Sequence, residues 1–298
     1  MNGRRFVITG AGGFVGRATV ALMDDGKNIV ETLSRSNVDY FDPAAIKKAL
    51  EPRGIPTTVI HLAGTAHRRV DDPEKCFAES IVQLTSVLLN SAIEVGVDTF
   101  VYASSSKVYG ESSGLSRITE RTIPQPGCPY GRAKLVAENL ILSKSDKIKC
   151  RILRFPPIFG PSAGGAVKHL MRAAKLGVPL PLFDSALPLR NFLYIENAAK
   201  FIEKAATAKD FPEILNPVDG PSLTVAEFYD RLRSAITANS NHFGSHWELP
   251  KLIRNGLKRV PFLEPLFAPF EIESEWDANR LGIHLFDRDT ALRASVSV

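Results

Sequence analysis

Short apolar runs alternate with amphipathic segments along the first half of the chain. Runs rich in β-branched residues predict strands at residues 6–9, 29–33, 58–62, 99–103 and 150–154. Apolar residues at helical spacing predict helices between them, in segments around residues 20–23, 46–50, 84–92 and 130–142. Parallel strands need crossover connections, which helices provide. The alternation therefore predicts an α/β fold with a doubly wound parallel sheet.

The pattern changes after Pro156, where prolines become frequent and one clear helix is predicted, at residues 167–176. Two later segments, residues 192–195 and 214–217, look like strands that return to the sheet. We therefore expect a first domain of residues 1–160, completed by return strands near residues 191–217. A smaller C-terminal lobe is expected from residues 161–190 and 218–298, over the carboxyl ends of the strands.

Composition narrows the class of protein without naming a function. Of the 298 residues, 44% are hydrophobic and 23% are charged, which is ordinary for a globular protein. The net charge of +5 modestly favours anionic ligands and is too small to indicate nucleic acid. Cys76, Cys128 and Cys150 lie far apart, so neither a disulfide framework nor a metal site is predicted, and a cytoplasmic location is expected. No apolar run approaches the roughly 18 residues of a membrane span, so none is expected.

A glycine cluster follows the first predicted strand and opens the first predicted helix. Gly10, Gly13 and Gly16 have the spacing GxxGxxG, with Phe14 and Val15 before the last glycine. Such glycines permit a tight turn, a close approach of the pyrophosphate, and close packing of helix on strand. Amides at the helix N-terminus then hold the anion. In this strand–turn–helix context, the motif predicts a Rossmann-type domain that binds a dinucleotide.

The end of the second predicted strand bears on which dinucleotide is bound. A carboxylate there binds the ribose 2′-hydroxyl of NAD, whereas a cation accommodates the 2′-phosphate of NADP. The chain has Arg35 between two serines and no acidic residue at the strand tip. This favours NADP over NAD, the alternative being an arginine that only faces solvent.

Tyr130 and Lys134 have the spacing YxxxK, which places both side chains on one face of a helix. A phenol with a pKa near 10 is a poor base at neutral pH, and a neighbouring ammonium is expected to lower that pKa. Three serines at residues 104–106 end the preceding strand, where a hydroxyl can hydrogen-bond a reacting oxygen. These residues predict proton transfer at a carbon–oxygen bond.

With these motifs, nearly the whole chain resembles the extended short-chain dehydrogenase/reductase family, of the nucleotide-sugar epimerase and dehydratase type. Further marks are HLAG at residues 61–64, SSSKVYG at 104–110, LRFPPIFGP at 153–161 and RNF at 190–192. The resemblance implies catalytic roles for Ser105, Tyr130 and Lys134. It implies that the cofactor contacts Asp39, Tyr40, Leu62, Ala63, Gly64 and Pro156, besides the glycine turn, Arg35, Tyr130 and Lys134. It implies that the substrate contacts Ser106, Lys107 and Arg190, the last at a diphosphate.

Departures from the family pattern narrow the expected reaction. In 4,6-dehydratases an Asp and a Glu follow the catalytic hydroxyl, whereas this chain has Ser106 and Lys107, which makes dehydration unexpected. The nearest resemblance is to bacterial UDP-sugar 4-epimerase-like proteins and 4-keto-reductases of surface-polysaccharide pathways. The expected activity is oxidoreduction at carbon 4 of a UDP-sugar, with Arg35 favouring reduction over epimerisation. The alternative is a non-catalytic dinucleotide sensor of the same fold.

The resemblance also implies a homodimer, which such enzymes often form through a four-helix contact. The predicted helices at residues 80–96 and 130–143 are the segments expected to supply it.

Overall fold

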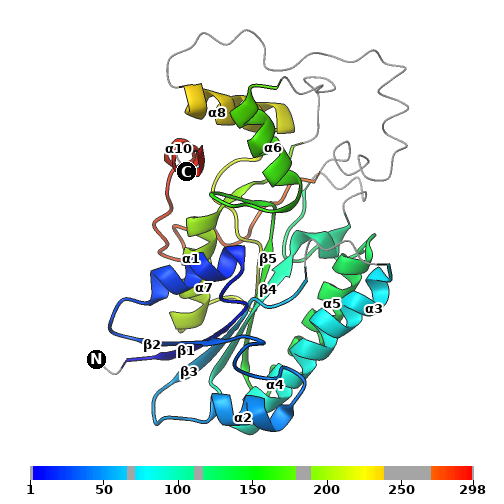
Figure 1. The fold of residues 1–298 in the computed structure, drawn as a ribbon, viewed down its shortest axis with the longest axis vertical. Coiled ribbons are helices and arrows are strands. Elements are labelled where there is room, and N and C mark those ends of the chain that lie inside the picture. Colours follow the sequence, from blue (N-terminus) through cyan, green and yellow to red (C-terminus); the bar gives the residue numbers. More distant parts are fainter. Residues whose placement is uncertain (1–2, 66–70, 111–116, 179–188, 238–269, 297–298) are drawn as a thin grey trace.

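A six-stranded parallel sheet forms the centre of the molecule (Figure 1). The computed structural model describes residues 3–65, 71–110, 117–178, 189–237 and 270–296. The sheet contains β1 (Arg5–Thr9), β2 (Ile29–Leu33), β3 (Thr57–His61), β4 (Thr99–Ser105), β5 (Lys149–Phe155) and β8 (Ile214–Leu215). The helices are α1 (Phe14–Met23), α2 (Pro43–Leu50), α3 (Pro73–Phe77), α4 (Leu84–Glu94), α5 (Pro129–Leu142), α6 (Gly165–Leu176), α7 (Ile195–Thr207), α8 (Val225–Thr237) and α10 (Arg288–Val296). The predicted α/β Rossmann-type class is confirmed.

The order of the strands determines where a ligand can enter the sheet. The order is β2-β1-β3-β4-β5-β8, so the chain passes from β1 to β2 on one side and returns to β3 on the other. Strand order therefore reverses between β1 and β3. In open α/β sheets the crevice at such a reversal, outside the carboxyl ends of the strands, is the usual ligand site. The glycine turn follows β1 at this point.

Helices cover both faces of the sheet, as doubly wound topology requires (Figure 1). Alternation along β1 shows the two faces: Val7 packs into the cluster formed with α2, α4 and α5, whereas Phe6 and Ile8 pack into the cluster formed with α1 and α7. All three side chains are at most 1% exposed. A strand buried on both faces reads as a continuous apolar run, which is the pattern that residues 6–9 show.

A further apolar cluster lies beyond the carboxyl end of β5, where α6, α8 and α10 gather (Figure 1). Its aromatic centre stacks Phe192 on Phe228, with ring centroids 3.9 Å apart. The prediction that residues 192–195 return to the main sheet is wrong: β7 (Leu193–Tyr194) pairs with β6 (Ile158–Phe159) in a separate two-stranded sheet. The second return strand is confirmed, because β8 pairs with β5. Residues 179–188 and 238–269 of the expected lobe lie outside the described residues.

The helical stretch Pro73–Glu94 is long and apolar enough to cross a membrane by length and composition alone, which the sequence prediction did not anticipate. It comprises α3, the π-helical turn η1 (Ala78–Gln83) and α4. Its apolar residues pack into the cluster against the sheet, where Ile81, Leu84 and Leu88 are at most 2% exposed. Core packing therefore accounts for its apolar character.

The buried charge of Arg5 yields a stability prediction. Its guanidinium donates to Glu31 (2.6 Å) and to the carbonyls of Ala49 (2.6 Å) and Glu51 (2.9 Å) at the end of α2. Because these acceptors would lose their donor, Arg5→Met is expected to destabilise the fold by about 3 kcal/mol, measured by urea unfolding. Arg53→Met removes an arginine that is 55% exposed and pairs with the same Glu31, so it is expected to cost less than about 1 kcal/mol. Equal losses in the two variants would contradict this account.

Candidate active site

The glycine turn is packed too tightly for side chains at two of its positions. A Cβ on Gly16 would lie 2.1 Å from the carbonyl oxygen of Gly10, and a Cβ on Gly10 would lie 2.7 Å from the Ala63 nitrogen. Gly10 also has a φ of 71°, in the left-handed region. The turn thus holds β1, α1 and the segment after β3 against one another.

Helix α1 begins at this turn with its amide groups available to a ligand. Gly13 is the N-cap, no side chain caps the helix, and no acidic residue stands in its first turn. The helix dipole favours an anion here. Phe14 and Val15, in the first turn, pack against the cluster around α6 and α8. The residues present therefore fit a pyrophosphate at the reversal point of the sheet.

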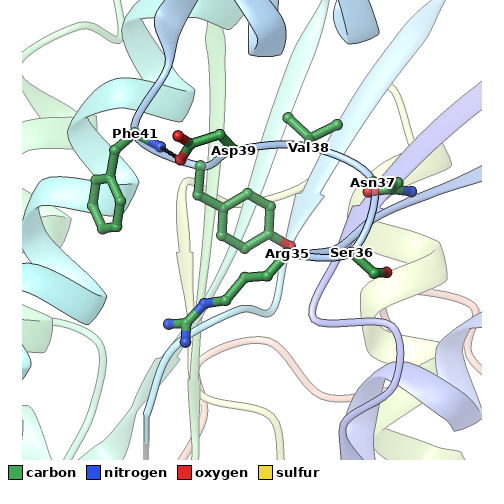
Figure 2. A pocket seen from close by; sticks show the side chains of 7 residues that line it. Arg35, Ser36, Asn37, Val38, Asp39 and Phe41 are labelled. Carbon is green, nitrogen blue, oxygen red and sulfur yellow. Dashed lines mark hydrogen bonds between the residues drawn. The ribbon is translucent and has the colours of Figure 1, made fainter.

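The loop after β2 lines a cavity of about 360 Å³, formed by the side chains of residues 35–41 (Figure 2). Figure 2 shows the exposed Arg35 side chain pointing away from Val38. Asp39 accepts a hydrogen bond from the Phe41 amide (2.9 Å). Tyr40 is 6% exposed, and its hydroxyl donates to the Leu33 carbonyl oxygen (2.5 Å). Burial raises the pKa of Tyr40, while the Gly10 backbone and Arg35 act to lower it. The phenol therefore interacts with both the glycine turn and Arg35.

A buried hydrogen-bond chain joins the glycine turn to the interior. His61 Nδ1 lies 2.7 Å from Thr9 Oγ1, and His61 Nε2 lies 3.1 Å from Thr85 Oγ1. Thr9 Oγ1 also accepts from the Ala63 amide at 3.2 Å. Burial, reinforced by the charge of Lys134, lowers the pKa of His61 to about 3. A neutral imidazole thus positions the ends of β1 and β3, where Leu62, Ala63 and Gly64 follow.

Ser105 and Tyr130 meet where the start of α5 packs on the end of β4. Gly131 permits this contact, since a Cβ there would lie 2.6 Å from the Lys107 carbonyl oxygen. Cys128 is the N-cap of α5, with Sγ accepting from the Gly131 amide at 3.4 Å. The Tyr130 ring packs edge-on against Phe77, at a centroid distance of 5.6 Å. The structure thus brings together the predicted hydroxyl pair.

The pKa of Tyr130 moves opposite to the prediction. Burial raises it well above the usual value near 10, Cys128 raises it further, and hydrogen bonding with Ser105 offsets only part of the rise. The expected lowering by Lys134 does not occur. Burial lowers the pKa of Lys134 itself to about 8, against the opposing effect of Glu138. The charge of Lys134 alone predicts a lower pKa for Tyr130, whereas in the fold desolvation has the largest effect on the pKa of both groups.

Lys134 points into the sheet rather than directly at the phenol. Its Nζ donates to the Ala103 carbonyl oxygen (2.7 Å) and lies 4.5 Å from the Tyr102 ring centroid, against 5.8 Å from that of Tyr130. The Tyr102 ring is in turn 5.5 Å from that of His61. Tyr130 and Lys134 are therefore linked through Tyr102 and His61 to the strand that bears the glycine turn.

The remaining predicted residues lie in three separate segments. Ser106 and Lys107 begin the 3-10 turn η2 (Ser106–Tyr109) directly after Ser105. Pro156 is buried and follows β5, the neighbour of β4. Arg190 is 8% exposed; its backbone pairs with Leu223 and its guanidinium lies 5.9 Å from the Phe270 ring centroid. Arg190 thus belongs to the region around the C-terminal segment.

Sequence reasoning missed several polar residues packed beneath the site, above all Thr85, Tyr102, Glu138 and Arg154. Glu138 stands four residues after Lys134, and the helical spacing that paired Tyr130 with Lys134 extends to it. For Thr85 and Tyr102 no sequence signal exists. Thr85 lies on α4 and Tyr102 on β4, and their roles depend on His61, which comes from β3. Within the ranges that the structure describes, no group of three potential metal ligands occurs.

The fold and this arrangement define a dinucleotide-binding oxidoreductase architecture, and comparisons with known proteins identify the family. The model of the NAD dependent epimerase/dehydratase family matches residues 6–216. The chain is 29% identical over 278 residues to UDP-glucose 4-epimerase from Vibrio cholerae, an alignment covering 83% of this chain and 78% of that one. The chain belongs to the NAD dependent epimerase/dehydratase family, a group of extended short-chain dehydrogenase/reductase enzymes.

Solved structures agree on the fold. UDP-N-acetylglucosamine 4-epimerase from Bacillus cereus superposes with a TM-score of 0.78 at 22% identity, covering 98% of this chain and 95% of that one. UDP-glucose 4-epimerase from Thermus thermophilus, in complex with NAD, gives a TM-score of 0.73 at 22% identity, covering 98% and 97%. The predicted family resemblance is confirmed.

Proposed function

We propose that the protein catalyses NAD(P)-dependent oxidoreduction at carbon 4 of a UDP-sugar, and that it acts as a 4-keto-reductase in surface-polysaccharide synthesis. The observation that carries the proposal is the convergence of Ser105, Tyr130 and Lys134 at the carboxyl edge of the sheet, linked through His61 to the glycine turn. Relatives named as UDP-sugar epimerases support the substrate class.

The raised pKa of Tyr130 keeps the phenol protonated at neutral pH, the state required of a proton donor. A protonated phenol is an acid at neutral pH, so Tyr130 donates its proton to the oxygen of a 4-ketone while Ser105 hydrogen-bonds the same oxygen. A reduced nicotinamide bound at the glycine turn would supply the hydride for carbon 4. Solvent then returns a proton to Tyr130. Arg35, which favours an exchangeable NADPH, is the feature that supports reduction over epimerisation.

The substrate, in this proposal, lies against Ser106, Lys107 and Arg190, and residues 161–190 and 218–298 are proposed as the substrate-binding lobe. Arginine donors suit the diphosphate. Ser106 and Lys107 lack the carboxylates that water elimination needs, so dehydration is not proposed. Pro156 and residues 62–64 line the cofactor. We further propose a cytoplasmic homodimer with α4 and α5 at its interface. The exposed Val136 on α5 and three free cysteines fit that assignment.

Substrate and reaction can be tested together. The protein is incubated with UDP-4-keto-6-deoxy-N-acetylglucosamine or with UDP-N-acetylglucosamine, each with NADPH, while nicotinamide absorbance and the product sugars are followed. Stoichiometric consumption of NADPH with the keto sugar supports a reductase. Interconversion of UDP-N-acetylglucosamine with its 4-epimer without net NADPH loss instead indicates an epimerase.

Cofactor choice follows from Arg35, which we propose binds the 2′-phosphate of NADP together with the hydroxyls of Ser34 and Ser36, while Asp39 and Tyr40 contact the adenine. Arg35→Ser is expected to raise the Kd for NADPH by about tenfold to a hundredfold, since hydrogen bonds to charged groups contribute roughly 1.5–3 kcal/mol. The Kd for NADH is expected to change less than about twofold. Arg53→Ser, outside this loop, serves as the matched control. Unchanged affinity for both cofactors would assign Arg35 to solvent, and equal weakening of both would mean that Arg35 contacts a part of the dinucleotide that NADPH and NADH share.

A further inference from the structure

Helix α5 carries a third inward-facing titratable group beyond the Tyr130–Lys134 pair. Glu138 lies one turn after Lys134, and successive i, i+4 positions share one helix face. Lys134 is 5% exposed and Glu138 is fully buried. The helix thus presents a phenol, an amine and a carboxylate in a row against β4 and β5.

Donors from two strands converge on the Glu138 carboxylate. Arg154 of β5 donates from Nε to both oxygens (3.1 Å each) and from Nη2 to Oε2 (2.7 Å). Ser104 of β4, next to Ser105, donates its hydroxyl to Oε1. An ionised carboxylate is an acceptor only, so it suits a site to which every neighbour donates.

The contacts continue past Arg154 to the other segments around the site. Arg154 Nη1 donates to the Tyr109 hydroxyl (2.9 Å), and that hydroxyl donates to Asn216 Oδ1 (2.9 Å). Tyr109 ends the turn η2 that holds Ser106 and Lys107. The Glu138–Arg154 pair therefore ties α5, β4, β5 and η2 into one unit.

Burial lowers the pKa of Lys134, so the side chain needs a nearby negative charge to stay protonated as an ammonium group. The titratable groups that face it are His61 from β3, Tyr102 from β4, and Tyr130 and Glu138 from α5. The imidazole is neutral, and burial raises the pKa of both phenols, so neither carries charge at neutral pH. Among these neighbours Glu138 supplies the negative charge, and Arg154, facing Glu138 from β5, supplies its counter-charge.

We propose that Glu138 is a positioning residue for the reaction: held by Arg154 and Ser104, it keeps Lys134 as an ammonium and fixes the strand end that bears Ser105. Apolar residues can often replace a buried ion pair without loss of stability. Stability alone therefore does not explain the buried Glu138–Arg154 pair. The catalytic consequence rests on the proposed function, whereas the effect on Lys134 does not.

The test follows the titration of Lys134 in the full-length protein by NMR of isotopically labelled lysine side chains, with Lys134→Met to assign the signal. Glu138→Gln removes the charge while keeping the shape. The Lys134 midpoint is expected to fall by about one pH unit, because an opposite charge nearby is lost. Since the ammonium disappears as pH rises through the pKa, the alkaline limb of turnover is expected to shift to lower pH by the same amount.

Glu74→Gln is the matched control, because Glu74 pairs with exposed Arg132 on the same helix α5. It is expected to leave the midpoint unchanged. The double variant Glu138→Gln/Arg154→Met removes both buried charges, so it decides the matter if the single variant fails to fold. An unchanged Lys134 midpoint in a folded variant overturns the proposal. If Glu138→Gln and the double variant both fail to fold, the proposal is also overturned, because the Glu138–Arg154 pair would then be needed only for the stability of the core. A shifted midpoint without turnover on any UDP-sugar would refute the proposed function and leave this inference standing.

Discussion

Tyr130→Phe is expected to lower turnover by about a hundredfold to ten-thousandfold, the usual contribution of a general acid or base. The change removes the proton that the ketone oxygen receives and keeps the ring that packs against Phe77. Cofactor affinity and melting temperature are therefore expected to stay near the wild-type values. The measurement is the steady-state rate with UDP-4-keto-6-deoxy-N-acetylglucosamine and NADPH, beside a direct titration of NADPH binding.

Tyr194→Phe provides the control for loss of a buried phenol. Tyr194 is 2% exposed on β7, outside the six-stranded sheet, and its ring packs against Phe159. This variant is expected to retain turnover. A Tyr130→Phe variant with wild-type turnover would exclude Tyr130 from the chemistry. If the wild-type protein binds cofactor tightly but turns over no UDP-sugar, the non-catalytic sensor becomes the better account.

The second large effect is expected at the glycine turn. Gly16→Ala would place a methyl group 2.1 Å from the Gly10 carbonyl oxygen and 2.7 Å from the Ala11 Cα. Both contacts are with backbone, so the turn must open for the methyl group to fit. Overpacking of this kind costs about 3 kcal/mol, which corresponds to a loss of dinucleotide affinity of roughly a hundredfold or more. Isothermal titration with NADPH and with NADH measures it.

Gly12 allows the same substitution without the collision. A Cβ on Gly12 meets no atom within 4 Å. Gly12→Ala is expected to keep the melting temperature of the cofactor-free protein and to bind dinucleotide at least about tenfold more tightly than Gly16→Ala. Equal loss of affinity in the two variants would exclude our explanation for Gly16, namely that it allows α1 to pack closely on β1.

Local pattern was enough to predict most of the main sheet. The strands predicted at residues 6–9, 29–33 and 150–154 appear as β1, β2 and β5, because short runs with β-branched and other apolar residues mark strands in the sequence. The pairing of residues 193–194 with 158–159 was not predictable in the same way. Apolar content marks residues 193–194 as a strand. Whether that strand pairs with the main sheet or with β6 depends on how the helices pack.

The residues proposed for the site divide similarly. Motif spacing predicted that Ser105, Tyr130 and the glycine turn share one edge, since parallel strands and the helices after them place their ends together. The proton affinity of the phenol was predicted in the wrong direction. Charge is visible in a sequence as a lysine four residues away, whereas desolvation depends on every atom packed around the hydroxyl.

The sequence by itself therefore determined the class of fold, the position of the glycine turn and the residues that meet at the edge of the sheet, because these depend on short-range spacing. Only the tertiary structure decided the protonation of those residues and the buried groups that control it. Glu138, Arg154 and Ser104 come from one helix and two strands. The low polarity of the interior makes their mutual charges effective over distances that solvent would otherwise screen.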